Sequence, residues 1–228
     1  MLDVKKIRVP STLSERAYEA IKESLLKIDV TQMKDENRID ERSLSESLGI
    51  SRTPLREAIN RLVMEGFLKV VPRKGIYVVK KSKKEIIEIL LVRAALEGMA
   101  ARLATKYITE KDIQRMKEIF SPFNLSNMKV QLLKYSNANI EFHELVLQLS
   151  QCEKLIDLAK SIFEHIRWIR FRAATFEERL VKRHQEHLKI IEAMEKKDAD
   201  LAEKNMREHI VGLARFIEEK EEFFIRQI

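Results

Sequence analysis

The chain has 228 residues, a net charge of +7, and only five glycines and four prolines. This length suits two domains, and 45% hydrophobic with 35% charged residues is typical of a helix-rich protein. No apolar run approaches the ~20 residues of a membrane span, which excludes a membrane-spanning helix. No apolar stretch typical of a signal peptide follows the first lysines, and the lone Cys152 cannot form an internal disulfide. We therefore expect a cytoplasmic location.

The charge is distributed unevenly along the chain. Residues 1–84 contain 19 Lys and Arg against 12 Asp and Glu, whereas residues 85–228 contain 24 of each. A basic region in front of a neutral one indicates that the first region binds a polyanion, although a merely solvated basic surface is the alternative. All five histidines lie in the second region: His143, His165, His184, His187 and His209.

The first region begins with two predicted helices. Apolar residues at every fourth position predict a helix over Leu13–Leu25. Residues 29–37 are polar and predict a loop. Asp40 is well placed to cap a second helix over Glu41–Leu48, and Gly49 is expected to end it.

A third helix follows directly and is expected to end at Gly66. We expect the Ser51 hydroxyl to cap it by accepting a hydrogen bond from its first free amides. Two short helices joined by a turn that contains glycine have the spacing of a helix-turn-helix. Free amides at a helix start suit phosphate, and arginine can grip guanine through two hydrogen bonds. The predicted DNA contacts at this helix start are Ser51, Arg52, Thr53 and Arg56.

A β-hairpin is predicted after the third helix. Residues 67–71 and 76–79 are two β-branched runs around a basic turn, which is typical of a wing. Arg73 and Lys74 lie at its tip, and Gly75 permits close approach to a DNA backbone or minor groove. The alternative for Arg52 and Arg56 is an exposed helix with surface ion pairs, since Glu57 is close by.

The stretch Leu48–Ala58, followed by Arg61-Leu62, Glu65-Gly66 and Gly75, resembles the signature of the GntR superfamily of bacterial regulators. The resemblance covers about a third of the chain. It implies a winged helix-turn-helix that contacts DNA through Arg42, Ser51, Arg52, Thr53, Arg56, Lys74 and Gly75. The family usually has a Gly and a Pro-Gly turn after the first helix. Here residues 29–37 replace that turn, which we interpret as an altered loop.

The second region is predicted to be an antiparallel all-helical bundle, which makes the fold class mainly α. No stretch alternates like a strand, and the approximate helices are 83–105, 110–120, 128–149, 153–173, 176–196 and 198–224. We place the DNA-binding domain at residues 1–80, a basic linker at 81–84 and the helical domain at 85–228.

Three histidines in this bundle are candidates for a metal site. Asn139 and His143 share one helix face because they are four residues apart. His187 and His209 lie on two later helices among apolar residues, so three imidazoles could meet. Each histidine alone is more simply structural, but the joint pattern favours a divalent metal such as zinc or nickel. His165 and His184 are interpreted as structural.

The second region also resembles the FCD ligand-binding domain of FadR-type regulators. The resemblance rests on Asn139–His143, Glu186-His187, Met206–His209 and the opening Arg93–Glu97. It implies a metal bound by Asn139, His143, His187 and His209. The family usually has Asp where this chain has Asn139, so we expect weaker metal binding and an uncompensated positive field. That field suits a small carboxylate effector, with Arg93 and Arg167 or Arg170 as further anion contacts.

Together these features predict a sequence-specific DNA-binding transcription regulator. We expect a homodimer on a palindromic operator, with operator affinity modulated by the metabolite. One alternative is a metal-dependent enzyme that uses the bundle site, but Glu141 lies on a different face from Asn139 and His143 and gives no convincing general base. The other alternative is an architectural protein that binds any duplex equally.

Overall fold

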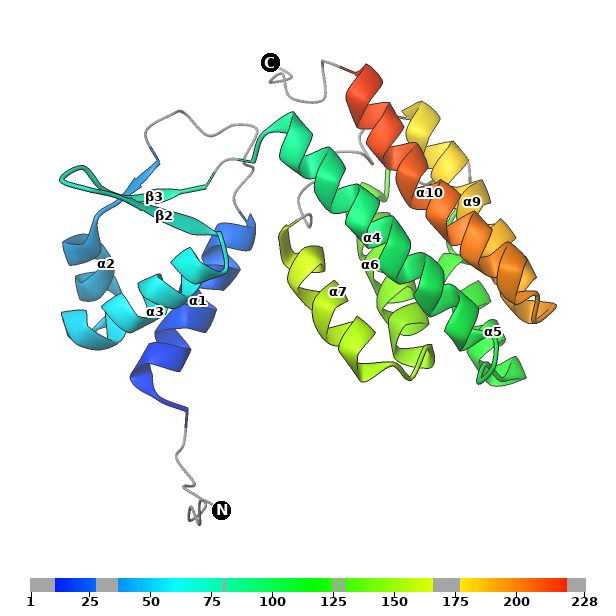
Figure 1. Ribbon diagram of the computed structural model, residues 1–228, viewed down its shortest axis with the longest axis horizontal. Helices are drawn as coiled ribbons and strands as arrows, with labels where there is room; N and C mark the ends of the chain where they lie inside the picture. Colours follow the sequence, from blue (N-terminus) through cyan, green and yellow to red (C-terminus); the bar gives the residue numbers. More distant parts are fainter. Residues whose placement is uncertain are drawn as a thin grey trace, which may run out of the picture. The chain divides into compact units, whose positions relative to one another are not determined.

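The computed structural model describes residues 11–27, 37–79, 81–124, 127, 130–165 and 177–220. The chain divides into two compact units, residues 1–80 and 81–228 (Figure 1). None of the helices in the described ranges combines the length and apolar character needed to cross a bilayer. The loop predicted at 29–37 lies outside these ranges, apart from its last residue.

The first unit is a helix-turn-helix with a small sheet, as predicted. Its elements are α1 (Leu13–Lys27), β1 (Arg38–Ile39), α2 (Glu41–Leu48), α3 (Arg52–Met64), β2 (Leu68–Val71) and β3 (Gly75–Val78). The strands are antiparallel in the order β1-β3-β2, and β2 and β3 form the wing (Figure 1). The core between α1, α3 and β2 is apolar and includes Ala17, Ile21, Leu55, Ile59, Leu62 and Leu68.

The helix ends of this unit agree with the prediction at two positions and differ at a third. Asp40 accepts a hydrogen bond from the Arg42 amide at 3.1 Å, and Gly49 ends α2 in the left-handed conformation with φ +64°. Both predictions are confirmed. Ser51 occupies the N-cap position of α3, but its hydroxyl makes no capping bond in the described structure. The predicted cap at Ser51 is therefore wrong.

The second unit is the predicted helical bundle. Its described helices are α4 (Lys83–Ala104), α5 (Glu110–Phe120), α6 (Leu132–Leu149), α7 (Glu153–His165), α9 (Glu177–Glu195) and α10 (Ala199–Glu219). α4 begins inside the stretch predicted as a linker, because Ser82 and Glu85 form a reciprocal capping box at its start. α6 begins at Leu132, later than the predicted residue 128. The next helix was predicted over 153–173; α7 covers its first part, and residues 166–173 lie outside the described residues.

Close packing of α4 against α10 brings the bundle together (Figure 1). Gly98 permits this approach, because a Cβ at this position would lie 3.0 Å from Cδ of Arg207 and closer still to its Cγ. The apolar core runs through all six described helices and includes Leu90, Met116, Phe142, Ile190, Met206 and Leu213. Within this core, α4, α6, α9 and α10 bury charged and polar side chains as well. Those side chains form the candidate site.

Candidate functional site

The predicted DNA contacts on α2 and α3 lie on the exposed surface of the first unit. Ser51, Arg52 and Thr53 are exposed at the start of α3. The Nε atom of Arg42 lies 3.0 Å from Glu46, and Nε of Arg56 lies 2.5 Å from Glu41. Arg56 therefore pairs with a glutamate of α2 and not with the neighbouring Glu57. Exposed pairs of this kind contribute about 0–1 kcal/mol, so a phosphate can replace the glutamate at little cost.

The wing presents its basic residues through an unusual backbone. Arg73 has φ +62° and Gly75 has φ +121°, so the tip turns sharply and carries Lys74 between them. A Cβ at Gly75 would lie 2.9 Å from Nε of Arg38, whose side chain crosses the strand at that point. The Arg38 guanidinium ends a flexible side chain and can shift, so it is the φ of +121° that favours glycine at this position. Arg38 was not identified from the sequence, because a strand of two residues is too short to show the alternation of polar and apolar residues that predicts a strand.

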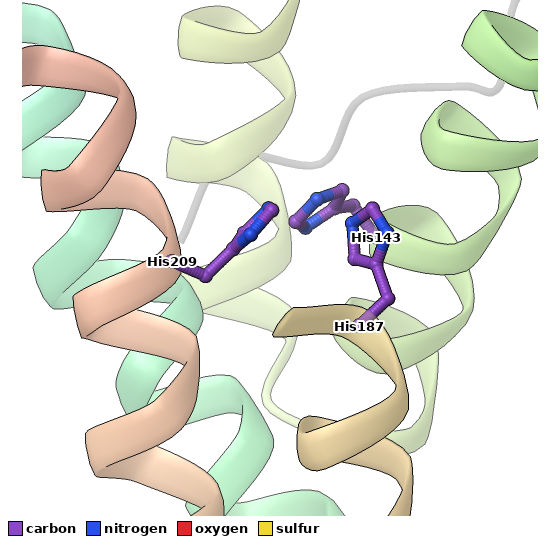
Figure 2. Close-up of side chains that lie close together, drawn as sticks. All are labelled: His143, His187 and His209. Carbon is purple, nitrogen blue, oxygen red and sulfur yellow. The ribbon is translucent and has the colours of Figure 1, made fainter. Parts of the chain in front are cut away.

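The three predicted histidines converge from three helices in the second unit. Figure 2 shows His143 of α6, His187 of α9 and His209 of α10 with their rings turned toward one another. One nitrogen of each ring lies within 4.8 Å of the others, and all three side chains are buried. Asn139 is also buried and lies one turn before His143 on α6. Structure thus places all four predicted metal ligands in the interior of the bundle.

Each imidazole is held from behind by a polar group that sequence interpretation did not assign. Nδ1 of His143 donates to the buried Glu97, and Nδ1 of His209 donates to Glu186 at 2.8 Å. Nδ1 of His187 lies 3.4 Å from the Tyr135 hydroxyl. Because a carboxylate only accepts, Nδ1 of His143 and Nδ1 of His209 carry the proton, and Nε2 of both rings keeps its lone pair. This is the arrangement in which histidine binds a metal through Nε2. The Tyr135 hydroxyl can donate or accept, so it leaves both tautomers open to His187.

Arginines lie behind these backing groups. Arg93 pairs with Glu97, Arg179 donates to both oxygens of Glu186 at 3.0 and 2.9 Å, and the Arg183 guanidinium lies 5.2 Å from the Tyr135 ring centroid. Arg179 also donates to the backbone carbonyl of His209 at 2.9 Å. The ion pair between Arg93 and Glu97 could have been predicted from the sequence, because opposite charges four residues apart on the apolar helix α4 suggest a buried ion pair.

Burial favours the neutral form of two of the imidazoles, His187 and His209. Desolvation lowers the pKa of His187 well below its usual value, and His209 and His143 lower it further. Desolvation also lowers the pKa of His209 to about 4, although the Glu186 carboxylate acts in the opposite direction. Neutral imidazoles have the lone pair that a metal requires.

The expectation of an entirely uncompensated metal field needs correction. Glu97 and Glu186 bring two carboxylates behind the imidazoles, each close to one ring. Arg93 and Arg179 balance these two charges, because each pairs with one of the carboxylates. A bound dication would therefore keep most of its positive field through a balance of charges that the histidines and Asn139 alone do not reveal.

Of the three predicted effector contacts, only Arg93 falls within the described residues. Its guanidinium is buried, pairs with Glu97 and lies 4.9 Å from the Phe163 ring centroid. Its Nη2 atom has no hydrogen-bond partner among the described residues. Arg167 and Arg170 lie outside the described residues, so their predicted role stays a prediction.

Comparisons with known proteins match one family to each unit of the chain. Residues 13–78 match the bacterial regulatory proteins of the gntR family, and residues 88–212 match the FCD domain. The Nta operon transcriptional regulator of Aminobacter aminovorans is 34% identical over 153 residues, which cover 67% of this chain and 71% of that protein. The transcriptional repressor RspR of Escherichia coli is 26% identical over 182 residues, or 78% of each chain.

Solved structures share the fold. The structure of E. coli McbR/YncC superposes with a TM-score of 0.71 at 22% identity, over 92% of this chain and 99% of that one. The matched families and relatives are transcriptional regulators and not enzymes. The chain therefore belongs to the GntR family of bacterial transcriptional regulators and carries an FCD domain behind its DNA-binding domain.

Proposed function

We propose that this regulator binds a palindromic operator as a homodimer and that a small carboxylate, bound with a divalent metal among the three histidines, changes its operator affinity. The convergence of His143, His187 and His209, each held through Nδ1, carries the sensing half of the proposal. The carboxylates behind His143 and His209 leave Nε2 of both rings with its lone pair, which is the form that binds a metal.

The start of α3 supports sequence-specific DNA binding. Because the Ser51 hydroxyl makes no capping bond in the described structure, the first amides of α3 are available to a phosphate oxygen. Arg52 and Arg56 are exposed on the same turn and can reach base edges in the major groove. Arg42 on α2, Arg38 on β1, and Arg73 and Lys74 in the wing add cations on the flanks.

The donor set fits a transition metal. Zinc–nitrogen bonds of about 2.0–2.1 Å place ligand atoms roughly 3.3 Å apart, so the rings, now within 4.8 Å, need to close by little more than an ångström. Nε2 of His187 is buried and has no hydrogen-bond partner among the described residues, which is costly unless a ligand binds it. His143, His187, His209 and Asn139 would hold zinc or nickel. When bound, the metal would supply a positive charge that attracts a carboxylate.

Arg93 supports a carboxylate effector beside the metal. Its unpartnered Nη2 is a buried donor on α4, and its positive charge acts on the His209 imidazole. An acid that binds the metal through one oxygen and Arg93 through another would satisfy both groups. Arg167 and Arg170 remain further candidates for this contact.

An apolar stripe on α4 supports the homodimer. Leu91, Val92 and Met99 are 49%, 52% and 40% exposed, and the exposed Ala95 lies between them on the same face. A long helix that is apolar on its outer face as well as its inner face is typical of a subunit interface. Two such subunits would present two α3 helices to a two-fold symmetric site. Since the operator lies on the chromosome, a cytoplasmic location is part of the proposal.

The enzyme alternative finds no support in the site. Its nearest carboxylates, Glu97 and Glu186, are each held between an imidazole and an arginine, so neither is available as a general base. The architectural alternative predicts equal affinity for any duplex, which the following experiment measures.

Operator binding by the metal-loaded protein tests the proposal. An operator is selected from a randomised duplex library, and fluorescence anisotropy at several salt concentrations compares it with a scrambled duplex. Arg52→Ala/Arg56→Ala should weaken operator binding by about 30-fold or more, because each bidentate guanine contact contributes roughly 1–3 kcal/mol. Arg115→Ala/Lys117→Ala removes two exposed cations from the second unit and is the matched control.

The sensing arm of the experiment adds lactate, malate or citrate at saturating concentration. A change in operator affinity of at least fivefold for one of these acids is expected, and it should disappear in His187→Ala. If the arginine variant keeps its selectivity, the DNA-reading assignment is wrong. If no acid or metal changes operator affinity, the sensing assignment is wrong.

A further inference from the structure

A basic groove lies between α9 and α10, and its floor reaches Glu186 and His209 at the edge of the histidine centre. It has a volume of about 710 Å³, and every residue that lines it is described. Figure 1 shows these two helices side by side at one edge of the bundle. A hollow of this size suits a small molecule. The proposed DNA contacts lie in the other unit, and of the three histidines in the candidate metal site only His209 lines the groove.

The charges along the groove are predominantly positive. Its four cations are Lys182, Lys189, Arg207 and Arg215. Three of them have no ion pair with another described residue. The fourth, Arg207, lies 3.4 Å from Glu203, which also pairs with Arg102. Glu208 is the one acid in the lining besides Glu186.

Glu186 at the floor of the groove adds little negative charge of its own. Arg179 donates to both of its oxygens, and His209 donates to one of them at 2.8 Å. The carboxylate is thus neutralised from below. The lining as a whole therefore attracts anions.

The shape of the groove limits the size of its ligand. Lys182 and Lys189 are seven residues apart on one face of α9, which corresponds to a separation of about 10 Å along the helix. At one end, the Asn205 amide donates to the Lys189 carbonyl at 3.1 Å and joins the two helices. At Gly212, a Cβ would lie 3.7 Å from both Arg179 and Glu186. Glycine thus leaves the floor open down to their ion pair.

We propose that this groove binds a small phosphorylated metabolite that carries two phosphate groups about one groove length apart. Lysine ammonium groups are compact point charges that suit phosphate, and a pair at each end of the groove can hold one phosphate each. Lys182 and Arg215 form one end, and Lys189 and Arg207 form the other. Gln185, which lies between Lys182 and Lys189 on α9, supplies an uncharged contact between the two ends.

Isothermal titration of the full chain with fructose 1,6-bisphosphate tests the site. We expect saturable binding with one ligand per chain, weakened by salt because the contacts are ionic. Lys182→Glu/Lys189→Glu should weaken binding at least tenfold. Lys111→Glu/Lys160→Glu makes the same charge change at exposed positions outside the groove and should leave affinity within twofold.

A second variant separates a seated ligand from diffuse attraction to surface cations. Gly212→Ala keeps every charge and fits an α-helix, but adds a methyl group over the floor. It should weaken binding severalfold while its circular dichroism melting curve stays cooperative. Equal affinity in the groove variant and its control, unchanged affinity in Gly212→Ala, or the absence of saturable binding would each overturn the proposal.

Discussion

Arg56 and Arg93 are both paired with a glutamate, but the two pairs lie in opposite surroundings. The side chains of Arg56 and Glu41 are 63% and 27% exposed, whereas those of Arg93 and Glu97 are 2% and 0% exposed. In water an ion pair is weak and easily exchanged, while in the interior each partner depends on the other for its charge. The DNA-binding unit thus keeps its cations available to a partner. The FCD unit uses its charges to fix the position of an imidazole.

The largest expected effect comes from breaking the buried pair. Glu97→Gln leaves the Arg93 charge without its counterion and removes the carboxylate that accepts from His143. The free energy of unfolding should fall by roughly 3–5 kcal/mol, and zinc affinity should fall about 10–100-fold. Urea denaturation of the metal-free protein and zinc titration measure the two losses.

A double variant separates these two consequences. Arg93→Met/Glu97→Leu removes both charges and should recover most of the lost stability, but the zinc affinity should stay low because His143 still lacks its acceptor. A Glu97→Gln variant as stable as the wild type would contradict the role assigned to the pair.

Acid provides the next test of the comparison, because all five histidines lie in the second unit. Burial lowers the pKa of His187, and lowers that of His209 to about 4, so the folded state resists protons that the unfolded state accepts below about pH 6.5. Stability is therefore fully present above pH 6.5 and is lost as the pH falls toward 4. We expect a loss of roughly 1–2 kcal/mol from His209 between pH 6.5 and 5, and a further loss in the same direction from His187.

Hydrogen exchange read by mass spectrometry, with rates corrected for pH, resolves this effect by unit in the metal-free protein. Protection should fall in α6, α9 and α10 between pH 6.5 and 5, and should stay constant in α1 and α3. Zinc should suppress the loss, since it competes with the proton for the same nitrogen atoms. Equal losses in both units would contradict the assignment.

The same contrast decides what could be predicted from sequence. Helical period placed α1, α2 and α3, and the outward-facing residues Arg52 and Arg56 followed from that period alone. The histidines were identified because their residue type is rare and their neighbours are apolar. Glu97 and Glu186 were not, because their contacts with His143 and His209 join positions 46 and 23 residues apart and exist only after packing.

Two further differences have local causes. Ser51 has the residue type and position of an N-cap, but capping also depends on the rotamer of its side chain, which no sequence pattern predicts. Arg93 was predicted to contact the effector. In the structure its guanidinium forms an ion pair with Glu97, and its Nη2 atom has no hydrogen-bond partner among the described residues. For both residues the sequence predicted the position of the side chain correctly, but not the group with which the side chain interacts.

The smallest expected effect comes from breaking the exposed pair. Glu41→Gln removes the carboxylate that lies 2.5 Å from Arg56 on the surface of the first unit. The free energy of unfolding should change by no more than about 1 kcal/mol, because solvent already screens both charges. Operator affinity should stay equal or rise, since Arg56 no longer has to leave a carboxylate to reach DNA. Glu57→Gln makes the same charge change one residue from Arg56 and is the control for net charge. A loss of more than 2 kcal/mol in Glu41→Gln alone would mean that the pair is structural, and Arg56 would then resemble Arg93 rather than differ from it.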